Sequence, residues 1–110
     1  MIERILLQYL HNKGFAVYLE MPTTLPDEFI IIEKTGSNFT NQVTRSTIAI
    51  QSYSTTLANA IELNEDVKEA VLDIVELANI GGCDLVSDYN FTDTSIKRYR
   101  YQAVFEITHY

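Results

Sequence analysis

The sequence predicts an α+β fold: a mainly antiparallel sheet packed against one long helix and a short N-terminal helix. Three observations indicate this class. An apolar pattern of helical period follows residue 56, runs of β-branched and aromatic residues lie on both sides of it, and turn residues separate these runs. The chain has 110 residues, of which 46% are hydrophobic and 21% charged, and this composition fits a single domain covering 1–110.

The N-terminal segment predicts a short amphipathic helix. Apolar residues at 2, 5, 6, 9 and 10 follow helical spacing, and Lys13-Gly14 is a suitable stop because glycine tolerates the positive φ of a helix end. The apolar stretch within this helix is too short and too interrupted for a signal peptide or a membrane span. Residues 15–20 are rich in strand formers and predict the first strand.

Residues 29–53 predict a hairpin. Phe29-Ile30-Ile31-Ile32 is a continuous apolar run, which favours a central strand buried on both faces. Thr35-Gly36-Ser37-Asn38 has turn chemistry, and from Gln42 to Tyr53 polar and apolar residues roughly alternate. We therefore expect the strand at 42–53 to pair with the strand that starts at Phe29 across a polar loop at 35–41, with Phe39 exposed in that loop.

One long amphipathic helix is predicted after Ser54-Thr55-Thr56, which can cap it. No Gly or Pro occurs from there to Gly81-Gly82, which we expect to end the helix, and at 100° per residue one broad face is apolar. The opposite side carries an acidic stripe, which consists of Glu62, Asp66, Glu69, Asp73 and Glu76. Like charges four residues apart destabilise a helix by about 0.2–0.5 kcal/mol per pair, so the stripe is either a solvated face or a contact surface.

The C-terminal segment predicts two more strands, at 84–92 and 97–108, joined by a turn at 93–95. The element order is then α-β-β-β-α-β-β, with one face of the sheet covered by helices. Lys97, Arg98 and Arg100 form a basic cluster at the start of the last strand. This cluster indicates either an edge strand protected by charge or a second contact surface.

The sequence predicts no catalytic, cofactor-binding or metal-binding residues. Its net charge of −7 argues against a general nucleic-acid or membrane-surface binder, because such binders need clustered cations. The single cysteine, Cys83, cannot form an internal disulfide. Asp84 and Asp88 are four apart, are expected to share a strand face and could hold a hard cation together with Asp93, but no calcium-type loop supports such a site. A small enzyme that uses Asp84, Asp88 or His109 is one alternative.

Several local features, together with the size and the element order, point to a known family. They are Asp27-Glu28-Phe29-Ile30-Ile31 after a proline-containing loop, Tyr53 followed by Ser54-Thr55-Thr56-Leu57-Ala58, and Lys97-Arg98-Tyr99-Arg100-Tyr101-Gln102 before a final apolar strand. Over nearly its whole length the chain resembles the tail-terminator (tail-completion) proteins of long-tailed bacteriophages and prophages. Many relatives carry a tryptophan near the long helix, and here Tyr53 stands roughly in its place.

The resemblance implies a homo-oligomeric ring, typically a hexamer, on the head-proximal end of the tail tube. There the ring would stop polymerisation of the tail tube protein and offer a surface to a head-connector protein. It also implies a location in the virion after a period in the host cytoplasm, with DNA only passing through the lumen and no membrane partner. A head–tail connector subunit and a small protein-binding adaptor that uses the tyrosine-lined last strand are alternatives.

For assembly, the sequence predicts a head-to-tail contact between complementary charges. Arg98 and Arg100 of one copy are expected to meet the stripe of the neighbour, namely Glu62, Asp66 and Glu69. Phe39 is expected to be a docking residue, because a Phe at a loop tip buries apolar area only when a partner arrives.

Overall fold

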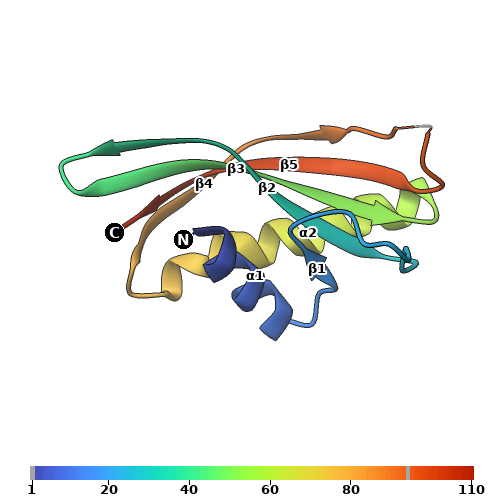
Figure 1. Cartoon of the computed structure of the whole chain (residues 1–110), viewed down its shortest axis with the longest axis horizontal. Helices are drawn as coiled ribbons and strands as arrows, with labels where there is room; N and C mark the ends of the chain where they lie inside the picture. Colours follow the sequence, from blue (N-terminus) through green and yellow to red (C-terminus); the bar gives the residue numbers. More distant parts are fainter. Residues whose placement is uncertain (1, 94) are drawn as a thin grey trace.

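Two helices pack against one face of a five-stranded sheet in the computed structural model, which describes residues 2–93 and 95–110 (Figure 1). The predicted α+β class and the order α-β-β-β-α-β-β are confirmed. The elements are α1 (Ile2–Asn12), β1 (Val17–Tyr18), β2 (Phe29–Thr40), β3 (Val43–Ser54), α2 (Leu57–Leu72), the 3-10 helix η1 (Asp73–Glu76), β4 (Ile80–Asn90) and β5 (Tyr99–His109).

The strands lie in the order β1-β2-β3-β5-β4. The short β1 pairs in parallel with Ile30 and Ile31, and every other neighbouring pair is antiparallel. Alternate residues of β2, β3 and β5 face the helices and form the main core, because successive side chains of a strand point to opposite faces. This core contains Ile30, Ile32, Ile48, Ile50, Ala103, Phe105 and Ile107 with Leu6, Leu10, Val67, Val71 and Ile74 from the helical segments.

A second, smaller cluster covers one end of the opposite sheet face. Phe29 and Tyr53 are stacked with ring centroids 4.5 Å apart, and both are fully buried. Ile31 completes the cluster, with Leu25 and Ile96 packed against it from the loops before β2 and β5. The apolar run at the start of β2 is therefore buried on both faces, as predicted.

The long helix ends earlier than the sequence predicts. Its N-cap is Thr56, as expected, whose Oγ1 accepts a hydrogen bond of 3.1 Å from the Asn59 N–H. However, α2 ends at Leu72, and η1 buries Ile74 while the chain turns toward β4. Gly81 lies inside β4, where a Cβ would come within 2.6 Å of the Tyr110 hydroxyl, so this glycine makes room for the C-terminal ring.

The predicted turn at 35–38 is wrong, because β2 continues to Thr40 and the hairpin turns at Asn41 and Gln42. Both turn residues have positive φ (54° and 64°), as the tightest hairpin turns require. A bulge lies between Lys34 and Gly36. The hairpin projects beyond the helices at the left of Figure 1, and Phe39 near its tip is 68% exposed.

Candidate functional site

A candidate interaction surface lies at β4, an outer strand of the sheet. Its only strand neighbour is β5, and among the described residues no backbone hydrogen bond reaches the outer side of 81–90. Soluble proteins usually protect such an edge with charged residues (especially Lys), Pro, bulges, a cover or shortness. β4 is 11 residues long and contains no Lys, Arg or Pro, and its protection is limited to two bulges and two aspartates. It instead exposes three large apolar side chains, Leu85, Val86 and Tyr89.

A bulge in β4 sets the direction of these side chains. The pairing with β5 shifts between Leu85 and Ser87, which leaves Val86 as the extra residue and 59% exposed. An extra residue reverses the alternation of all side chains beyond it. The expectation that Asp84 and Asp88 share a face is therefore wrong: Asp84 lies opposite Glu106 on the helix-free face, and Asp88 lies on the helix-covered face.

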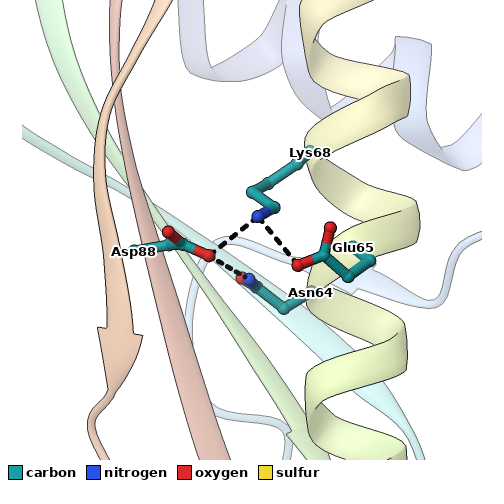
Figure 2. A network of polar contacts seen from close by, with 4 residues as sticks. All are labelled: Asn64, Glu65, Lys68 and Asp88. Atoms are coloured by element: carbon teal, nitrogen blue, oxygen red, sulfur yellow. Dashed lines mark hydrogen bonds and ion pairs between the residues drawn. The ribbon is translucent and has the colours of Figure 1, made fainter.

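A polar network joins α2 to β4 on the covered side (Figure 2). Lys68 Nζ lies 2.8 Å from Asp88 Oδ2 and 2.8 Å from Glu65 Oε1, and Asn64 Nδ2 donates to the same Asp88 oxygen at 3.1 Å. The hydrogen bond to Asp88, followed by the one to Glu65, raises the pKa of Lys68. Asn64, Glu65 and Lys68 belong to α2 and Asp88 belongs to β4. Their contacts therefore hold one flank of α2 beside the outer strand.

The same flank of α2 exposes apolar residues. At 100° per residue, Ile61 and Leu72 lie within about 40° of Lys68, on the side that faces β4. Both are more than one-third exposed. We call the combined feature the β4–α2 surface, and it consists of Ile61, Leu72, Leu85, Val86 and Tyr89. Its apolar side chains lie on both faces of the sheet along the open edge of β4. The Lys68–Asp88 ion pair joins α2 to β4 on the helix-covered face.

On the helix-free face, two glutamine side chains and the Tyr89 hydroxyl form a chain of hydrogen bonds. Gln51 Nε2 donates to Gln102 Oε1 at 2.9 Å, and Gln102 Nε2 donates to the Tyr89 hydroxyl at 2.5 Å. Both glutamines are buried. Tyr89 also packs edge-to-face on Phe91, with ring centroids 5.7 Å apart. These contacts fix the Tyr89 ring in one place while leaving it 40% exposed.

The acidic residues that the sequence singles out lie away from the sheet. Glu62, Asp66 and Glu69 are exposed on the outer side of α2, and none of them makes a salt bridge among the described residues. Glu76, lower in the same stripe, accepts a hydrogen bond of 3.1 Å from the Tyr9 hydroxyl. Glu62, Asp66 and Glu69, which we call the upper stripe, are therefore free for a contact, whereas Glu76 connects η1 to α1.

The arginines of the basic cluster are engaged within their own chain. Arg98 donates from Nε to Pro26 O at 3.1 Å and from Nη2 to Leu25 O at 3.2 Å. Arg100 donates from Nε to Phe91 O at 2.6 Å, and its guanidinium lies 4.3 Å above the Phe91 ring. These contacts fasten two loops to the sheet. The alternative of an edge strand protected by charge is wrong, because β5 lies between β3 and β4.

Of the three residues that the enzyme alternative names, Asp88 is paired with Lys68, Asp84 is exposed, and His109 contacts a buried serine. Burial, with a smaller effect from Asp84, raises the pKa of the Cys83 thiol to about 11, so the thiol stays protonated at neutral pH. The Ser46 hydroxyl lies 3.0 Å from His109 Nε2, but Ser46 is buried. Within 2–93 and 95–110, no group of three or more His, Cys, Asp or Glu side chains is placed to hold a metal.

Within the part that the structure describes, no helix combines the length and the apolar character needed to cross a membrane. No protein-family model matches the chain, and no curated protein matches it at a significant level.

Proposed function

We propose that this protein is a structural assembly subunit of a phage or prophage tail: a tail terminator that forms a ring, caps the tail tube and prepares it for head joining. Two observations support the proposal. The confirmed element order is one of the features on which the family resemblance rests. The observation with the greatest weight is the β4–α2 surface, which combines a long open strand edge with exposed apolar side chains. Such a surface promotes unwanted aggregation of a monomer, whereas a subunit that assembles with other chains can use it as an interface.

The proposed work is docking without catalysis. One ring face would match the docking surface of the last tube ring, and the other would refuse further tube subunits and receive a head-connector protein. Candidate reactive groups support this, since Asp88 is paired with Lys68 and the Cys83 thiol is shielded. The net charge of −7 is compatible with a lumen that lets DNA pass without binding its phosphates.

Phe39 and the charged residues are the proposed partner contacts. Phe39 lies near the tip of a projecting hairpin, where a tube ring or a neighbouring copy can cover its exposed ring. The contact of Arg98 and Arg100 with a neighbour's Glu62, Asp66 and Glu69 stays a prediction. The exposed stripe favours it, whereas the arginines already donate to Leu25, Pro26 and Phe91.

Deletion of the gene in the phage or prophage that encodes it tests this function. We expect tails of uncontrolled length that do not join capsids, measured by negative-stain electron microscopy, and restored tails when the gene is supplied on a plasmid. Tails of normal length that fail to join would instead assign the chain as a head–tail connector. Complete virions without the gene would overturn any role in tail assembly.

A further inference from the structure

We propose that copies of this chain associate by strand pairing, with the open edge of β4 in one copy hydrogen-bonded to the open edge of β2 in the next. This deepens the proposed ring by naming its contact, although strand pairing itself does not require a tail. The sheet has two open edges. One is β4, and the other is the outer side of 33–40 in β2, since β1 pairs only with Ile30 and Ile31. Among the described residues, no backbone hydrogen bond reaches either edge.

The strand directions suit a head-to-tail contact. Each of the pairs β2–β3, β3–β5 and β5–β4 is antiparallel, so β2 and β4 run in opposite directions. If the next copy is generated by a rotation about an axis parallel to the strands, each of its strands keeps its direction. Such a rotation can bring β2 of the next copy beside β4 of the first. The new pair is then antiparallel, like the rest of the main sheet. Such a contact repeats at each copy and closes into a ring where the rotation permits.

The charges favour β2 over a second β4 as the partner strand. β4 carries Asp84 and Asp88 and contains no cation, and of the two only Asp88 is paired among the described residues, with Lys68. Pairing of two β4 edges would bring two acidic strands together, whose unpaired carboxylates repel each other at low salt. The open edge of β2 carries Glu33 and Lys34, whose charges cancel, and otherwise only neutral residues. β2 therefore offers an edge with less repulsion.

The position of Phe39 supplies an independent argument. The bulge after Lys34 places Phe39 opposite Thr44, on the face of the sheet that carries the helices. Leu85 and the exposed flank of α2 lie on that same face of β4. When the sheet continues from one copy to the next, the Phe39 ring lies on the same side as this apolar flank. One contact thus pairs both open edges and covers the most exposed apolar side chains near them.

Mixing of two variants tests the proposal, with association measured by sedimentation velocity over a concentration series. V86K adds a charge at the β4 edge, and F39K adds one on the β2 hairpin. Both sites are largely exposed, so both variants should fold. We expect each variant alone to associate at least tenfold more weakly than the wild type. V75K, at an exposed apolar position in η1, outside both open strand edges and outside the β4–α2 surface, is the matched control and should associate normally.

The mixture separates a head-to-tail contact from a symmetric one. Head-to-tail pairing leaves an intact β4 in F39K and an intact β2 in V86K, so the mixture should form heterodimers that neither variant forms alone. Normal association of F39K together with failure of V86K would mean β4–β4 pairing and would overturn the proposal. A wild type that stays monomeric at millimolar concentration would also overturn it.

Hydrogen exchange on the wild type gives a test without substitutions. Amides of 33–40 and 81–90 that face outward should exchange at least tenfold more slowly in the oligomer than in the diluted monomer. Unchanged exchange at both edges would contradict strand pairing. The proposed function fails separately: complete virions after gene deletion remove the tail role and leave the pairing, whereas a V86K protein that assembles normally removes the pairing and leaves the tail role.

Discussion

Lys68 of α2 and Asp88 of β4 form an ion pair with 2.8 Å between Nζ and Oδ2, and this pair holds the helix against the outer strand (Figure 2). It is largely shielded, with the two side chains 16% and 27% exposed. Glu65 and Asn64 add hydrogen bonds to the same two residues. The pair therefore fixes the position of α2 relative to the edge at which we propose that the next copy attaches.

Loss of the Asp88 carboxylate should destabilise the protein. D88A removes the partner of Lys68 and of the buried Asn64 amide, so we expect the free energy of unfolding to fall by about 1–3 kcal/mol, measured by urea denaturation. D66N is the control, because Asp66 is exposed and makes no salt bridge among the described residues, and it should change the free energy by less than about 0.5 kcal/mol. Equal effects of the two substitutions would contradict this role of Asp88.

Acid should weaken the fold through His109. Burial, with added effects of nearby positive charge, lowers the pKa of His109 below its ordinary value of 6.5. The unfolded chain then binds a proton at a higher pH than the folded chain, so stability is full above about pH 6.5 and falls as the pH drops toward the folded pKa. We expect H109Q to flatten the stability profile between pH 7.5 and 5.5. H11Q, at the exposed histidine, should keep the wild-type slope, and a wild-type slope in H109Q would refute the assignment.

The hairpin turn contains a residue under backbone strain. Gln42 has φ of 64°, a conformation that costs a residue with a side chain about 1 kcal/mol and costs glycine little. Q42G should therefore raise the free energy of unfolding by about 0.5–1 kcal/mol, measured by urea or thermal denaturation. Q42A retains a Cβ at the same φ and should give no such gain. A destabilised Q42G protein would contradict the turn geometry.

Salt dependence tests the predicted charge contact between copies. The triple variant E62Q/D66N/E69Q removes the upper stripe without touching a salt bridge among the described residues. If the stripe meets Arg98 and Arg100 of a neighbour, this variant should associate more weakly than the wild type at low salt and equally at about 1 M salt, where exposed charges are screened within about 3 Å. The measurement is sedimentation velocity at both salt concentrations, with E20Q as the control. Equal association at low salt would exclude the charge contact and leave strand pairing intact.

Local patterns in the sequence predict most of the elements. The spacing of Leu6 and Leu10 predicted α1, and Thr56 caps α2 as expected. The last strand forms as predicted, and it packs Ala103, Phe105 and Ile107 into the core. These features depend on neighbours within one or two turns of the chain, and the residues that produce them are adjacent in sequence. The exposure of Phe39 was likewise predicted from its polar surroundings.

The faces of the strand segments beyond the two bulges were decided only by the tertiary structure. A bulge arises from pairing with a neighbouring strand, and one extra residue turns every later side chain to the other face. The bulges after Lys34 and Leu85 thus place Phe39 on the helix-covered face and separate Asp84 from Asp88. The hydrogen-bond partners of Arg98 also come from a distant part of the sequence, because Leu25 and Pro26 precede it by more than 70 residues. The sequence by itself determined which segments are helices and strands, whereas the contacts between distant segments determined which side chains remain available to a partner.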